Sequence, residues 1–131
     1  MTILSKKIIF LLHRTLAEAP SHDPSISEQA AQRGREKLRE VQSLYAKMSS
    51  ELADHRYWRY QRQVSPGLQE YIEALSFTHY LDHGSLITFE QAQQTLCDAS
   101  GKPVSLKLVP YSDLMHTELS IDGLRLFTRI I

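Results

Sequence analysis

The stretch RQVSPGLQEYIEALSFTHYL, residues 62–81, decides the fold of this chain. Ser65 is a favoured residue just before a helix and Pro66 is a favoured first helical residue, so the pair predicts a helix that begins here and runs to about His83. Gly84 suits the position just after a helix, where the backbone turns left-handed. The apolar face of this predicted helix consists of Leu68, Ile72 and Leu75, followed by His79 or Leu81. This spacing is typical of a helix that packs one face against a core.

Two further helices are predicted before this stretch. The first covers residues 2–19, because apolar side chains recur at helical spacing and Pro20 ends the pattern. The second begins at Ser25, where Glu28 completes a capping-box pattern, and extends to Gln63, a length of roughly 35 residues. Its apolar seam consists of Leu38, Val41, Tyr45, Met48 and Leu52. Spacings that alternate between three and four residues are expected of antiparallel helix packing.

A short fourth helix is predicted after the central one. It begins at Thr88, where Gln91 completes a second capping-box pattern, and it ends near Leu96. We therefore predict an all-α fold for residues 1–98, in the form of a partial, elongated, antiparallel helical bundle.

The tail, residues 99–131, has a different pattern. Residues 104–109 alternate between apolar and polar side chains like a strand, and residues 118–127 carry an Asp-Gly pair between alternating apolar residues, which indicates a hairpin. A helix over residues 113–121 is the competing interpretation. We predict that the tail is irregular or hairpin-like and forms a separate part of the chain.

Composition limits the classes of function. The 131 residues form one domain or part of one, and 42% apolar with 23% charged residues indicates a soluble globular protein. Fifteen basic and fifteen acidic residues give no net charge, which excludes a strongly basic nucleic-acid-binding module as a global interpretation. Cys97 is the single cysteine, which excludes an internal disulfide and fits a reducing compartment. The apolar run at residues 8–12 is too short to cross a bilayer, so no membrane partner is expected.

Two glutamates in the central stretch are candidate metal ligands. Glu70 and Glu73 are one helical turn apart and share one side of the predicted helix. Hard cations such as Mg²⁺ bind one or two carboxylates together with waters and substrate phosphates. Acidic pairs on helix surfaces are common, however, so the pair alone favours an ordinary solvated face.

An arginine stripe precedes the central stretch. Arg56, Arg59 and Arg62 recur every three residues, with Tyr57, Trp58 and Tyr60 between them. Arginine binds phosphates through paired hydrogen bonds, and bases stack on aromatic rings or guanidinium planes. The stripe is therefore a candidate nucleic-acid-binding surface. The competing interpretation, which the pattern alone favours, is a solvated face with the aromatic residues in the core.

Three strings, in order, resemble one family. The central stretch at residues 62–81, the string SKKIIFLLHR at residues 5–14 and the string GSLI at residues 84–87 are similar to the translin-associated factor X branch of the translin family. The resemblance implies a translin-like all-α fold and a hetero-oligomer with translin that encloses RNA. It implies a catalytic subunit whose carboxylates hold Mg²⁺ and cut single-stranded RNA. It also implies binding of single-stranded DNA and a location in both nucleus and cytoplasm.

The resemblance also assigns residues. The family's first acidic pair falls on Glu70 and Glu73, which implies that both are catalytic and bind Mg²⁺. The family's second pair has its nearest match at Glu118 and Asp122, where the spacing is kept and the acids are exchanged. Both are thereby implied as catalytic residues and Asp122 as a further metal ligand, although in a hairpin they would not point toward the central helix.

Relative to the family pattern, the chain is expected to be truncated at both ends. The missing helices would pack against the seam of the second helix, so that seam is expected to be partly exposed. Two hypotheses follow. The chain is an Mg²⁺-dependent endoribonuclease subunit of a translin complex, or it is a non-catalytic module that binds translin or nucleic acid.

Overall fold

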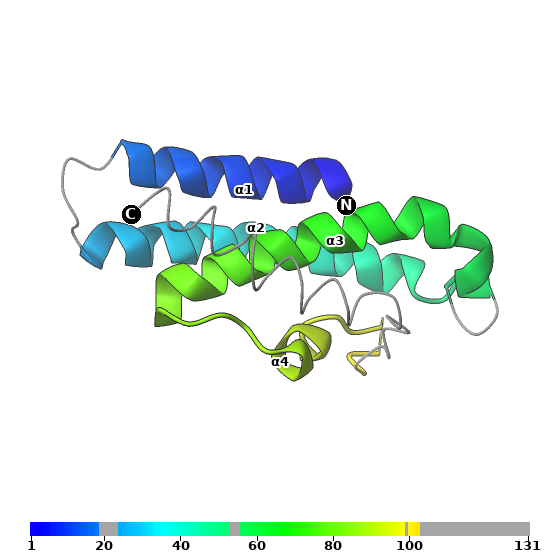
Figure 1. The fold of residues 1–131 in the computed structure, drawn as a ribbon. Helices are drawn as coiled ribbons and strands as arrows, with labels where there is room; N and C mark the ends of the chain where they lie inside the picture. The colour runs from blue at the N-terminus through cyan, green and yellow to red at the C-terminus, as the bar shows by residue number, and fades with distance from the viewer. Residues whose placement is uncertain (19–23, 53–55, 99, 103–131) are drawn as a thin grey trace.

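All regular elements that the structure describes are helices. The computed structural model describes residues 1–18, 24–52, 56–98 and 100–102. The helices are α1 (Thr2–Ala17), α2 (Pro24–Met48), α3 (Arg56–His83) and α4 (Phe89–Gln94) (Figure 1). This confirms the predicted all-α class. The predicted strand and hairpin signals of the tail lie outside the described residues.

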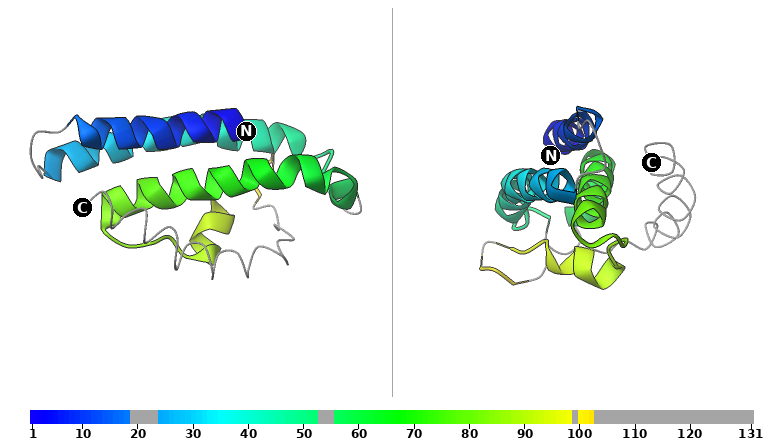
Figure 2. Two further views of the ribbon diagram at one scale, coloured as in Figure 1. Left: turned by 45° about the horizontal axis from the view of Figure 1, so that its top comes forward. Right: turned by 90° about the vertical axis from the view of Figure 1, so that its left-hand side faces the viewer.

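The three long helices form an elongated bundle. Each of α1, α2 and α3 contacts the other two. The chain runs in one direction along α1, returns along α2 and runs in the first direction again along α3 (Figure 1). Viewed end on, the three helices form a triangle, and α4 lies below α3 on the side away from α1 (Figure 2). Among the described residues, no helix combines the length and the apolarity that are needed to cross a membrane.

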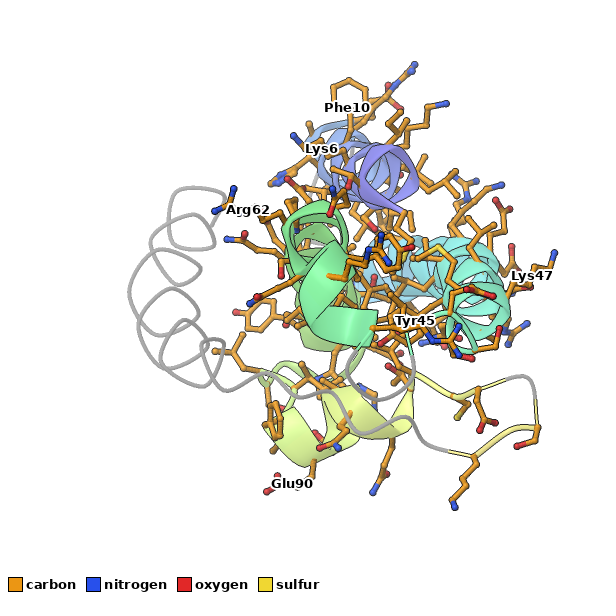
Figure 3. The ribbon with its side chains drawn as sticks, turned by 90° about the vertical axis from the view of Figure 1, so that its right-hand side faces the viewer. Lys6, Phe10, Tyr45, Lys47, Arg62 and Glu90 are labelled. Carbon is orange, nitrogen blue, oxygen red and sulfur yellow. The ribbon has the colours of Figure 1, made fainter. Side chains whose placement is uncertain are left out.

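The core lies between these three helices and extends to α4. The helix α3 is buried around most of its circumference along its second half. Its buried residues there are Gly67, Leu68, Tyr71, Ile72 and Ala74 to Thr78. From α1, Ile8 and Leu12 enter the core, whereas Ile3 and Phe10 of the same helix are exposed, and Phe10 projects away from the bundle (Figure 3).

The apolar seam of α2 is mostly buried. Leu38, Val41 and Tyr45 have at most 2% of their surface exposed, because α1 and α3 both pack against α2. Met48 remains exposed and Leu52 is half-buried. The expectation of a partly exposed seam is therefore wrong for the first three of its five residues and holds for Met48 and Leu52.

Two close approaches hold the three helices together. A Cβ atom on Gly34 of α2 would lie 2.6 Å from Thr78 Oγ1 of α3 and 3.2 Å from Leu12 Cδ2 of α1. A Cβ atom on Gly67 of α3 would lie 3.2 Å from the Cβ of Met1, at the start of α1. Glycine at both positions lets neighbouring helices approach more closely than a side chain would allow.

The boundary between the second and third helices differs from the prediction. The helix α2 ends at Met48, whose carbonyl accepts hydrogen bonds from the N–H groups of Glu51 and Leu52 in the turns that follow. The helix α3 begins at Arg56 and continues through Pro66. The predicted helix start at Ser65 and Pro66, and the predicted extension of the second helix to Gln63, are both wrong.

Burial explains why α3 continues through proline. Val64 and Leu68 are one turn apart and both are buried, so a continuous helix keeps the apolar face in register with the core across Pro66. The pyrrolidine ring faces solvent. Proline removes one helical hydrogen bond and bends the axis, and the first turns of α3 do lie at an angle to the rest (Figure 1). Tertiary packing therefore overrides the local start signal.

The other predicted helix ends agree with the structure in most details. Gly84 has a φ of 71° directly after α3. Thr88 caps α4: its Oγ1 accepts from the N–H of Gln91 at 3.2 Å, and its own N–H donates to Gln91 Oε1 at 2.9 Å. Ser25, in contrast, is not an N-cap, because Pro24 already takes the first helical position of α2.

Candidate carboxylate site

The candidate glutamates lie in the middle of α3, the most buried helix. Tyr71 and Ile72 stand between Glu70 and Glu73 in the sequence, and both are buried. Burial on two sides fixes the rotation of α3, so that Glu73 is exposed and Glu70 is half-buried. The structure therefore places the two carboxylates at neighbouring positions on the solvent side of a rigid helix, as the sequence predicts.

The carboxylate of Glu70 is paired with a cation from another helix. The Lys6 ammonium of α1 lies 3.3 Å from Glu70 Oε1. The Lys6 side chain is 64% exposed and that of Glu70 only 23% exposed. Figure 3 shows Lys6 on α1, which lies above α3 in that view. Sequence analysis did not find this pair, because it depends on how α1 and α3 are aligned.

The rotation of α3 is also held by a hydrogen-bond chain. Gln42 Nε2 of α2 donates to Tyr71 Oη at 3.0 Å, and Thr95 Oγ1 donates to the carbonyl of Ala92 at 2.7 Å. Because the Thr95 proton is used in this way, the Tyr71 hydroxyl donates to Thr95 Oγ1, 2.7 Å away. Burial raises the pKa of Tyr71 above its ordinary value. The hydroxyl therefore stays neutral, and it connects α2 and the end of α4 to the segment that carries the glutamates.

Sequence reasoning also missed Tyr71. A signal for it exists in the sequence, because a tyrosine at a core position of an apolar face usually needs a hydrogen-bond partner for its hydroxyl. The partners themselves, Gln42 and Thr95, come from other helices and are not visible in the sequence.

One arginine of the stripe and one of the two glutamates share an exposed strip of α3. The α3 strip, as we name it, consists of Arg62, Pro66, Gln69 and Glu73, all exposed and spaced four, three and four residues apart. Arg62 and Glu73 therefore face the same side, about 17 Å apart along the helix at about 1.5 Å of rise per residue. Figure 3 shows Arg62 pointing outward from the bundle.

The other members of the arginine stripe are exposed as well. Arg59 lies on the first turns of α3, next to the exposed ring of Tyr60. Arg56 is also exposed, and its Nη1 lies 3.4 Å from Glu51 Oε2. The predicted aromatic core on this segment is thus wrong for Tyr60, while the side chains of Tyr57 and Trp58 lie outside the described part of the chain.

The remaining predicted site residues cannot be placed. Glu118 and Asp122 lie outside the described residues. Within the part that the structure describes, no group of three or more His, Cys, Asp or Glu side chains could hold a metal ion. The described part therefore supplies two carboxylates from one helix. This number is compatible with Mg²⁺, which often binds one or two carboxylates and keeps several waters or phosphate oxygens. The Lys6 ammonium shows that a cation fits against Glu70.

Comparisons with known proteins agree on one family. Residues 1–121 match the model of the Translin family. Translin-associated protein X from Rattus norvegicus is 36% identical over 105 residues, which cover 78% of this chain and 34% of the relative. Translin-associated protein X from Pongo abelii is 30% identical over 95% of this chain and 41% of the relative.

The likeness extends beyond mammals. The Translin-associated protein X homolog from Schizosaccharomyces pombe is 28% identical over 85% of this chain and 43% of the relative. The aligned part of this chain thus spans between about a third and two-fifths of the length of these curated relatives. No solved structure matches the chain.

Proposed function

Because the chain belongs to the translin family, we propose that it acts as the translin-associated subunit of a translin complex and takes part in Mg²⁺-dependent cleavage of single-stranded RNA. The name of its mammalian and yeast relatives, Translin-associated protein X, supports the partnership with translin.

One observation carries the catalytic part of the proposal. Glu70 and Glu73 are adjacent acids on the solvent side of residues 67–78, the mostly buried segment of α3, and Glu73 shares the α3 strip with Arg62. Acidic side chains bind a divalent cation and arginine binds phosphate, so the strip places both kinds of group along one line. A single-stranded backbone that follows this line would contact Arg62 before it reaches the carboxylates.

Each residue then has a defined role. Glu70 and Glu73 would hold Mg²⁺, with Glu118 and Asp122 proposed as further ligands or catalytic groups. The chemistry that Mg²⁺ held there would supply is polarisation of a phosphate oxygen and activation of water for attack at phosphorus. Arg62 and its neighbours in the stripe would bind the backbone phosphates, while the buried Tyr71 keeps the two glutamates facing solvent.

Further parts of the proposal rest on the family resemblance and on the chemistry of the stripe. Single-stranded DNA offers the same phosphates and unstacked bases, so we include it among the ligands. Arg56, Arg59 and the exposed Tyr60 would bind both nucleic acids. A location in nucleus and cytoplasm is proposed as for the family.

A second candidate function is a non-catalytic translin- or nucleic-acid-binding module. Two observations favour it: the described part provides only two acids at the site, and one of them, Glu70, already has a cationic partner in Lys6. Such a module would keep the arginine stripe but would not cut RNA.

The test is cleavage of a labelled single-stranded RNA by this chain co-expressed with translin, in Mg²⁺ and in chelator. Glu73→Gln should abolish Mg²⁺-dependent cleavage, because it removes a ligand charge from an exposed position without disturbing the core. Glu90→Gln, at an exposed acid of α4, is the matched control and should cleave normally. A complex that binds RNA but never cuts it would establish the second function instead, and cleavage that survives Glu73→Gln would refute the site.

A further inference from the structure

The ion pair between Lys6 and Glu70 joins two helices at the proposed carboxylate site. Its geometry is set by backbone packing. Next to Lys6 in the sequence, Ser5 is fully buried, which fixes the rotation of α1. One turn before Glu70, Gly67 lets the start of α1 lie directly against α3. The bundle therefore delivers the Lys6 ammonium to within 3.3 Å of Glu70 Oε1.

The two partners of this pair differ in freedom. The glutamate is largely enclosed and sits on a helix that the core holds firmly, whereas the lysine side chain is 64% exposed and ends in a flexible four-carbon stem. When a second cation approaches the same carboxylate, the lysine is the partner that moves. The positive charge of Lys6 also repels a divalent cation that approaches Glu70, until the lysine side chain moves away.

We propose that Lys6 is a positioning residue that competes with a divalent metal ion for the Glu70 carboxylate. Without metal, its ammonium neutralises Glu70 and relieves the repulsion between Glu70 and Glu73. With metal, it leaves the carboxylate and stays in solvent beside it. Lys6 thus sets the affinity of the site for the ion. This inference rests on the proposed metal site.

The competition is specific to one of two adjacent lysines. Lys7 is exposed on the same helix, one residue further on, and no ion pair of Lys7 is found in the described part of the chain. Lys7 therefore offers a matched control, with the same charge and nearly the same position but without the contact to Glu70.

The experiment is a titration of the full chain with Mn²⁺ alone, in which the free ion is counted by electron paramagnetic resonance. Lys6→Met should tighten Mn²⁺ binding by about two- to fivefold, the factor that a typical exposed ion pair contributes to an equilibrium. Lys6→Arg keeps the charge and should restore the original affinity, and Lys7→Met should change little. In a Glu70→Gln background, Lys6→Met should have no effect, because the shared carboxylate is gone.

The outcomes separate the inference from the function on which it rests. Unchanged or weaker Mn²⁺ binding in Lys6→Met, or equal tightening in Lys7→Met, overturns the competition, even where Glu70→Gln confirms the site by losing the ion. Mn²⁺ binding that is insensitive to Glu70→Gln overturns the carboxylate site itself. A thermal melt of each variant checks that the fold is intact. Lys6 and Lys7 are exposed, so substitutions at these two positions should leave the melting temperature unchanged.

Discussion

Replacing Gly34 by alanine should destabilise the bundle, although alanine is the better helix former. Gly34 lies inside α2 and is buried where all three long helices meet. In an open helix the substitution would stabilise by about 1 kcal/mol. Here the new methyl group would lie 2.6 Å from Thr78 Oγ1, 2.9 Å from Thr78 Cγ2 and 3.2 Å from Leu12 Cδ2. One of these atoms, or the helix that carries it, must move.

The magnitude follows from what Thr78 loses when it moves. Overpacking of a tight core costs about 1–3 kcal/mol. Thr78 is buried, and its hydroxyl donates to the carbonyl of Ala74 at 2.8 Å, so a rotation forfeits a hydrogen bond of about 1 kcal/mol. The gain in helix propensity offsets about 1 kcal/mol. The net loss in the free energy of unfolding is therefore about 1–3 kcal/mol.

Urea denaturation of the full chain, followed by circular dichroism, measures this loss as a lower midpoint with an unchanged slope. Ser43→Ala, at an exposed position of α2, isolates the propensity effect and should not destabilise. Thr78→Ala removes both of the atoms closest to the new methyl group, so Gly34→Ala should cost less in that background. A Gly34→Ala chain as stable as the original, or a loss that Thr78→Ala leaves unchanged, would refute the packing argument.

Three further variants test single contacts. Tyr71→Phe removes the hydroxyl between Gln42 and Thr95 and should lower the free energy of unfolding by about 1–3 kcal/mol in urea titrations, because it leaves polar groups without their partner. Thr88→Ala breaks the capping box of α4 and should cost about 1 kcal/mol, measured in the same way, whereas Thr88→Ser should cost little. The pKa of His13 is lowered by burial, so the unfolded chain binds the proton more readily. The contribution of neutral His13 to stability should be complete at a pH above its ordinary pKa of 6.5. It should be lost as the pH falls through 6.5 toward the lower pKa of the folded state. The His13→Gln variant should flatten this part of a plot of melting temperature against pH.

The sequence predicts best where the signal is local. The capping box at Thr88 and the left-handed Gly84 depend on residues a few positions apart, and the structure has both. The spacing of Glu70 and Glu73 is likewise a property of one helix. The fold class and the family follow from such local signals taken together.

The sequence predicts poorly where neighbouring helices decide. The start signal at Ser65 and Pro66 is locally sound, yet burial of the flanking apolar residues outweighs it and α3 runs through. Whether the apolar seam of α2 is buried depends on where α1 and α3 lie, and the spacing of the seam residues along α2 does not reveal this. The pairing of Lys6 with Glu70 depends on the alignment of two helices far apart in the sequence.

The burial of α3 on nearly all sides limits how this helix can vary. Between Gly67 and Thr78, only Gln69 and Glu73 are exposed and only Glu70 is half-buried. A substitution elsewhere in this segment alters the core first and the surface chemistry only indirectly. The helix can therefore change what it binds at very few positions without changing its stability. Random mutagenesis of the segment should yield mainly destabilised chains, with altered ligand binding confined to those few positions.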